Sequence, residues 1–160
     1  MTFIRKLVSF VIMSRWLQCP AVGTLGLLLV LAPAVAAEPV TASKPWFRYI
    51  APQIPAGGYM TLTNHTDHPA VLTGAASPAC GMLTVHRSEA MEGMERMLSV
   101  PSVTVPVGGT LSFAPGGYHL MCMSPRMKPG DHVDVTLNFQ GGQTVSVSFP
   151  VLSATARPRD

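Results

Sequence analysis

The sequence predicts an all-β protein, an antiparallel β-sandwich or barrel built as a single domain. After residue 37, no window of 12 or more residues combines helical periodicity with freedom from Pro and Gly. Some nine or ten short runs rich in β-branched and aromatic residues occupy this part of the chain instead. Turn residues separate these runs every eight to twelve residues, a spacing typical of sandwiches and barrels.

Each expected strand is an apolar or alternating run that stops at Pro, Gly or a polar cluster. His132–Phe139 alternates most clearly, and Gly141-Gly142 predicts a tight hairpin into the last strand. Ser88–Gly93 is polar and predicts a hairpin loop. In chain order, the expected strands are 46–50, 59–64, 70–76, 82–87, 94–100, 102–105, 110–114, 116–123, 132–139 and 144–150.

Residues 1–37 have the pattern of a signal peptide, so we exclude them from the fold. Basic side chains precede an uncharged run at 16–37, which ends in small residues that suit cleavage. The alternative is an uncleaved anchor, because 22 uncharged residues are enough to span a bilayer. Met13 is an alternative start. Cys19 does not suit lipid attachment, since Leu17-Gln18 precedes it in place of small residues.

The remaining chain divides into a polar lead-in at 38–45, the β-sandwich at 46–150 and a flexible tail at 151–160. The formal charge of +3 belongs to the leader, since eight basic and eight acidic residues follow it. A neutral domain gives no reason to expect a nucleic-acid partner. We expect an exported monomer, and the leader predicts the periplasm.

The densest chemistry lies in the expected strand that contains His119, Met121 and Met123. Side chains alternate between the two faces of a strand, so these three share one face while Cys122 points to the other. A thioether is a soft ligand that suits Cu(I) and not Mg, Ca or Mn. An imidazole and a thioether two residues apart therefore form two arms of a candidate metal site.

Cys80 and Cys122 are the two cysteines after the leader, and an exported protein permits a disulfide between them. The orientation of Cys122 away from His119 and Met121 favours a structural thiol. Two free buried thiols, or Cys122 as a third soft ligand, are the alternatives.

A second His/Met pair extends the pattern. His86 and Met97 precede His119 and Met121 with the spacing His-x10-Met-x21-His-x-Met. With Trp46, the strand Tyr59–Asn64 and the line 114–121, this spacing resembles the PCu(A)C family of periplasmic copper chaperones, over about residues 44–150.

The resemblance implies a cupredoxin-like Greek-key sandwich that binds one Cu(I) per chain through His86, Met97, His119 and Met121. It also implies delivery of copper to an accepting protein, such as another chaperone or a cytochrome oxidase subunit. The chain departs from the family pattern at Arg87-Ser88, where Glu-Met is common, and its tail lacks the His and Met that some members carry.

The other methionines and histidines have more modest expectations. Met60 and Met82 are expected in the core, and Met123 is expected as core filler or as a spare ligand. Met91 and Met94 are either transient ligands or ordinary loop and core residues. The remaining histidines, His65, His68 and His132, are expected in solvated turns or at strand ends, with His65 and His68 as an alternative metal pair.

Three other functions compete with copper delivery. Copper storage without delivery needs the same site, and a structural β-sandwich needs none. Electron transfer by blue copper requires a Cys thiolate beside the site, which Cys122 does not provide. We expect no enzyme, because no catalytic triad, carboxylate pair, phosphate loop or zinc-ligand set stands out.

Overall fold

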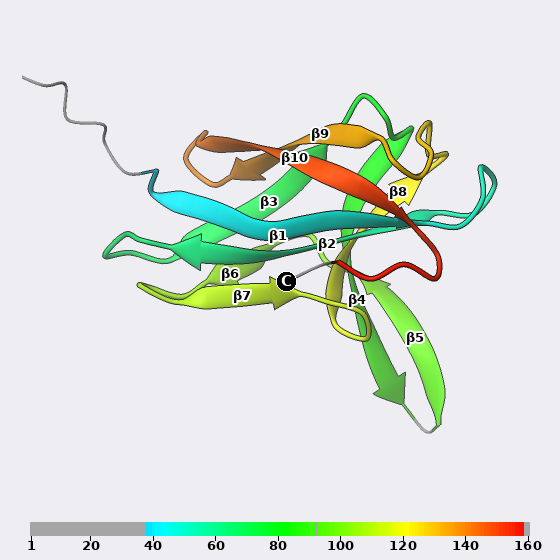
Figure 1. Ribbon diagram of the computed structural model, residues 1–160. Coiled ribbons are helices and arrows are strands. Elements are labelled where there is room, and N and C mark those ends of the chain that lie inside the picture. Colours follow the sequence, from blue (N-terminus) through cyan, green and yellow to red (C-terminus); the bar gives the residue numbers. More distant parts are fainter. Residues whose placement is uncertain (1–37, 92, 159–160) are drawn as a thin grey trace, which may run out of the picture. The chain divides into compact units, whose positions relative to one another are not determined.

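The computed structural model describes residues 38–91 and 93–158, and every regular element within them is a strand (Figure 1). The all-β prediction is therefore confirmed. None of the described residues forms a helix long and apolar enough to cross a membrane. The predicted signal peptide at 1–37 lies outside the described residues. The ten strands are β1 (Val40–Tyr49), β2 (Ala56–Asn64), β3 (Ala70–Ala76), β4 (Met82–Met91), β5 (Met94–Ser99), β6 (Val103–Val105), β7 (Thr110–Phe113), β8 (Tyr118–Met123), β9 (His132–Phe139) and β10 (Thr144–Ser153).

The strands form one continuous curled sheet with two facing halves. Its hydrogen-bonded order is β5-β4-β8-β7-β2-β1-β10-β9-β3-β6, and β8 pairs also with β2. Most pairings are antiparallel, whereas β1–β10 and β7–β8 are parallel. The β1–β10 pairing joins the half that contains β8 to the half that contains β9, which confirms the cupredoxin-like sandwich.

Alternating apolar side chains fill the space between the two halves. Leu62 of β2 and Leu120 of β8 are fully buried from one half, as are Leu72 of β3 and Leu137 of β9 from the other. Each buried side chain of this size contributes roughly 1.5–3 kcal/mol of hydrophobic stabilisation. β8 therefore has one face fixed in the core, which leaves its other face for a site.

Several strand boundaries differ from the prediction, and at two of them the prediction failed because of a proline. β1 begins at Val40, so most of the predicted lead-in is strand; Pro45 is accommodated by a register shift between Ser43 and Trp46. A bulge tolerates proline because its residue need not donate to the ladder. β10 continues through Pro150 to Ser153, so the predicted flexible tail starts with three strand residues.

The connection between β4 and β5 also differs from the prediction. Ser88 to Met91 belong to β4, and their ladder with β5 runs to the pair Met91↔Met94. The ladder between β4 and β8 stops at Arg87↔Tyr118, so beyond Arg87 the β4–β5 hairpin is a two-stranded arm (Figure 1). Polar residues indicated a loop here, but a ribbon that is solvated on both faces accepts polar side chains equally well.

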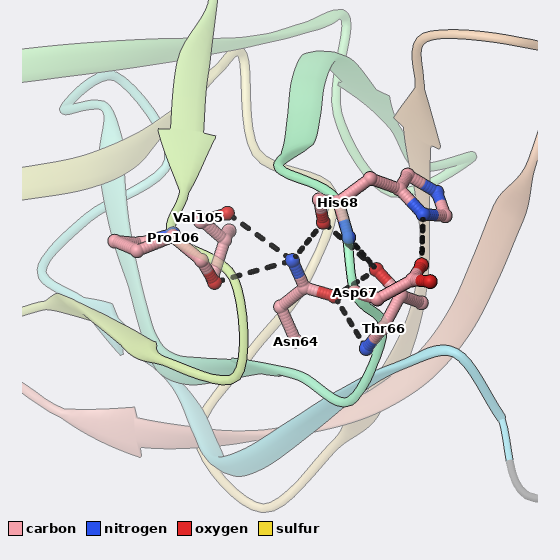
Figure 2. A network of polar contacts seen from close by, with 6 residues as sticks. All are labelled: Asn64, Thr66, Asp67, His68, Val105 and Pro106. Atoms are coloured by element: carbon pink, nitrogen blue, oxygen red, sulfur yellow. Dashed lines mark hydrogen bonds and ion pairs between the residues drawn. The ribbon is translucent and has the colours of Figure 1, made fainter.

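A buried amide holds two turns together at the end of β2 (Figure 2). Asn64 is 1% exposed, and its Nδ2 donates to the carbonyls of His68 (2.8 Å), Pro106 (3.2 Å) and Val105 (3.3 Å). Its Oδ1 accepts from the backbone N–H (3.0 Å) and hydroxyl (2.8 Å) of Thr66. One side chain therefore links the β2–β3 turn to the end of β6.

Replacing Asn64 with alanine is expected to lower the free energy of unfolding by about 2–3 kcal/mol, because it leaves buried polar groups without partners. Urea unfolding followed by circular dichroism measures this change. Gln140→Ala, which removes an exposed amide, serves as the control and should change stability by less than about 0.5 kcal/mol. Equal effects of the two substitutions would contradict this role of Asn64.

Candidate metal centre

β8 presents His119, Met121 and Met123 on the face that points away from the core. Leu120 and Cys122, which alternate with them, are fully buried. The alternation predicted from sequence is thus confirmed. The strand starts after a turn in which Gly116 has φ +80°, a conformation that side-chain-bearing residues rarely adopt.

The neighbouring strand β4 brings His86 beside His119. The antiparallel register pairs His86 with His119 and Thr84 with Met121. Directly opposed residues of an antiparallel ladder point to the same face. The two imidazole rings stack with centroids 6.0 Å apart and an interplanar angle of 26°. Thirty-two intervening residues separate these histidines in sequence, and the ladder makes them neighbours.

Met97 reaches the same face from β5. It is paired with Ser88, which lies two residues beyond His86 on β4 and so points to the same side as His86. The Met97 side chain is 61% exposed, whereas His119 is 7% exposed. Three adjacent strands therefore place all four predicted ligands on one face, with Met97 at the solvent side and His119 at the protected side.

Hydrogen bonds orient both imidazoles through their Nδ1 atoms. Nδ1 of His119 lies 3.1 Å from the carbonyl oxygen of Gly117. A carbonyl only accepts, so this Nδ1 carries the proton and Nε2 retains the lone pair that a metal requires. Nδ1 of His86 lies 3.2 Å from Oγ1 of Thr84. In each ring Nε2 is the nitrogen left for coordination, and such orienting bonds typically strengthen a metal site.

Aromatic side chains cover one flank of the centre. The ring of Tyr59 lies 6.5 Å from that of His119, and Trp46 packs on Tyr59 at 4.6 Å between centroids. Tyr59 extends over Gly57, the residue opposite Met121, where an added Cβ would meet the tyrosine hydroxyl at 2.7 Å. Glycine is therefore required beside Met121 for Tyr59 to lie as it does.

Next to these aromatic side chains, the centre has an open flank. Met97, His119, Tyr59 and Ser88 line a surface hollow together with Arg48, Pro115 and Gly116. Solvent therefore reaches the centre through this hollow, past the exposed Met97. An incoming ligand has the same route.

The donors of this centre carry no formal charge when the imidazoles are neutral. Among residues 38–91 and 93–158, no three His, Cys, Asp or Glu side chains gather into a metal-binding group. Arg87, which follows His86, stacks over Tyr118 at 5.3 Å and pairs with Glu89 at 3.4 Å. Two imidazoles and two thioethers suit a soft monovalent cation, and they lack both the carboxylates that hard divalent ions favour and the thiolates common at structural zinc sites.

Cys80 and Cys122 form a disulfide on the core side of β8. The prediction of a structural pair is confirmed, and Cys122 is not a ligand. The bridge also joins β8, which carries His119, to the segment that leads into β4, which carries His86.

More of the other methionines are exposed than was expected. Met60 is buried, as predicted, but Met82 is 57% exposed and its assignment to the core was wrong. Met123, at 37% exposed, is not core filler, and Met94, at 65% exposed, does not pack in the sandwich. A strand's exposed face is set by its neighbours, which residue type alone does not indicate. Met91 lies in β4, and its side chain is outside the described residues.

The remaining histidines lie outside the centre and are exposed, as predicted. His65 bonds through Nε2 to Oγ1 of Thr41 at 2.9 Å, while His68 contacts the Asp67 carboxylate at 3.0 Å (Figure 2). The His68 bond lowers the pKa of Asp67, and an exposed pair of this kind adds little stability. The two rings have different partners, so the alternative metal pair is not supported.

Sequence reasoning did not assign Tyr59, Thr84 or the Gly117 carbonyl to the centre. Gly57-Gly58-Tyr59 carried a usable signal, because a glycine within a strand often marks a bulge, a bend or a close approach of another group. Thr84 precedes His86 by two residues, so its place on the same face of the strand could also have been inferred from the sequence. The carbonyl of Gly117 had no signal in the sequence.

The fold and the donors on this face define a cupredoxin-like domain of the PCuAC type. The family model described as "Putative lipoprotein LpqE-like" matches residues 40–151, and the chain belongs to this family. The chain is 33% identical over 122 residues to "Putative lipoprotein Lxx21020" of Leifsonia xyli subsp. xyli, a match that covers 74% of this chain and 73% of that protein.

Solved structures of PCuAC domains share this architecture. The solution structure of CuI-DR1885 from Deinococcus radiodurans is 33% identical with a TM-score of 0.59, covering 76% of this chain and 83% of that one. The copper-bound PCuAC domain from PmoF2 is 23% identical with a TM-score of 0.58, covering 74% and 96%. The second likeness supports the fold alone.

Proposed function

We propose that this domain binds one Cu(I) through His86, Met97, His119 and Met121 and carries it to a copper-accepting protein outside the cytoplasm. The observation that carries the proposal is the register of β5, β4 and β8, which gathers these four side chains on one face. A relative supports it, since the 33% identical solution structure of DR1885 is a Cu(I) form.

The donor chemistry suits transport through an oxidising compartment. Thiolates bind Cu(I) more tightly but are oxidised there, whereas thioethers need no deprotonation and resist disulfide formation. The leader and the lipoprotein relatives support export, and we place the protein in the periplasm. We expect it to act as a monomer.

Release is expected to proceed by ligand exchange from the open flank. Met97 is the most exposed of the four donors and His119 is the least accessible. A Cys or Met of the acceptor therefore replaces Met97 first, while both imidazoles still hold the ion. A cytochrome oxidase subunit or another copper chaperone is the acceptor we propose. This exposed donor favours delivery over storage, the second candidate function.

An anaerobic Cu(I) titration against a competing chelator tests the site. The parent protein should bind one equivalent tightly through the four donors. Met97→Leu/Met121→Leu should lose this tight binding while keeping the volume and apolar character of both side chains. Met94→Leu, another exposed substitution on β5, is the matched control and should retain it. A parent that binds no Cu(I), or a double variant that binds like the parent, would overturn the proposal.

A further inference from the structure

Two exposed methionines lie beside the centre without a role in it. Met82 on β4 and Met123 on β8 are directly opposed in the antiparallel register. Opposed residues have Cβ atoms about 4.5–5.5 Å apart and point to one face. This is the face of His86, His119 and Met121, as parity along each strand requires.

Met121 adjoins this pair. It precedes Met123 by one strand period on β8 and is opposed to Thr84, which follows Met82 by one period on β4. The three thioethers therefore occupy neighbouring positions of a two-strand ladder. Met121 lies between the histidine pair and the outer methionine pair, so it is adjacent to both.

Packing does not account for the outer pair. Met82 and Met123 are 57% and 37% exposed, whereas Met60 and Met127 are almost completely buried. One exposed methionine needs no explanation, but two opposed ones beside a third form a specific arrangement. A methionine side chain has three rotatable bonds, so the sulfurs of an opposed pair can turn toward one ion.

The backbone beneath the pair is firmly held. The disulfide joins Cys122, between Met121 and Met123, to Cys80, two residues before Met82. The N–H of Gly81 donates to the carbonyl of Met123 at 2.8 Å. Binding here would therefore cost side-chain ordering but little backbone rearrangement, which favours affinity.

We infer that Met82 and Met123, together with Met121, form a second and weaker site for a soft monovalent cation such as Cu(I). Three thioethers give a neutral, soft donor set with no imidazole. Since Met121 is a donor that the two sites share, an ion can move between them by exchanging one ligand at a time, with no change of oxidation state. That transfer step rests on the proposed function, whereas the second site itself does not.

Anaerobic titration of the purified protein with Cu(I), followed by NMR of 13C-labelled methionine methyls and of the imidazoles, tests the inference. The first equivalent should shift the resonances of His86, His119 and Met97. The second should shift those of Met82 and Met123. Met82→Leu/Met123→Leu should retain the first step and lose the second, while Met94→Leu keeps both.

Two results would overturn the inference. In the first, the methyl resonances of Met82 and Met123 do not shift when a second equivalent of Cu(I) is added. In the second, the double variant still binds a second equivalent. A double variant with unchanged Cu(I) steps but weaker transfer to an acceptor would identify a docking patch instead. Failure of the proposed function is separate, since it removes the imidazole shifts of the first step. Both replaced side chains are exposed, and circular dichroism confirms that the variants fold.

Discussion

Replacing His119 with phenylalanine is expected to weaken Cu(I) binding by more than about a hundredfold, since loss of even an outer hydrogen-bonding partner costs about 10- to 100-fold at metal sites. His119 is the protected donor, covered by Tyr59 and oriented by the Gly117 carbonyl. Its Nε2 is the nitrogen left for coordination, and we expect it to hold the ion when an acceptor displaces Met97. Competition titration against a Cu(I) chelator measures the loss.

Phenylalanine is chosen because it keeps an aromatic ring in the buried position and limits the change in packing. His132→Phe, at an exposed position of β9, is the matched control and should leave the affinity unchanged. Circular dichroism of both variants establishes that they fold. Cu(I) affinity within a few-fold of the parent in His119→Phe would mean that His119 is not a ligand, whatever its position in the ladder.

The local features of the site could be predicted from sequence. Alternation along β8 is a property of any strand, so the common face of His119 and Met121, opposite to Cys122, followed from their numbering alone. The spacing of the four predicted ligands could be recognised because it resembles the motif of a known family. Neither argument required knowledge of which strands pair.

The non-local features could not be predicted from residue type. The register that opposes His86 to His119 is set where Val85 and Leu120 enter the core together, and it depends on long-range pairing. The exposure of Met82 follows from the same pairing, because the face away from the core has no covering layer there. A local pattern cannot indicate which face a distant strand will cover.

The predicted strand boundaries at two prolines were wrong for a related reason. Pro45 and Pro150 were both interpreted as strand breakers. Pro45 lies at the register shift in β1, and Pro150 lies where β10 stops pairing with β9 and starts pairing with β1. Both places relax the demand for a backbone donor. Tertiary context therefore decided the outcome where local chemistry indicated a stop.

Removing the Cys80–Cys122 disulfide is expected to lower the free energy of unfolding by about 4 kcal/mol on the chain-entropy model. The bridge spans 42 residues of sequence, so it restricts a long loop in the unfolded chain. Domains of this kind are stable by only about 5–15 kcal/mol. The bridge is therefore a large share of the total, and Cys80→Ala/Cys122→Ala should unfold at a markedly lower urea concentration.

Comparing three proteins separates the cross-link from the packing of the sulfur atoms. The oxidised parent should be the most stable, and the reduced parent should lose most of the roughly 4 kcal/mol expected from loop closure. The alanine pair should lose somewhat more, because both cysteines are buried in the core and their sulfurs leave small voids. Coincident urea curves for the oxidised and reduced parent would show that the bridge contributes no stability. The β4–β8 ladder would then be held in register by its core residues alone.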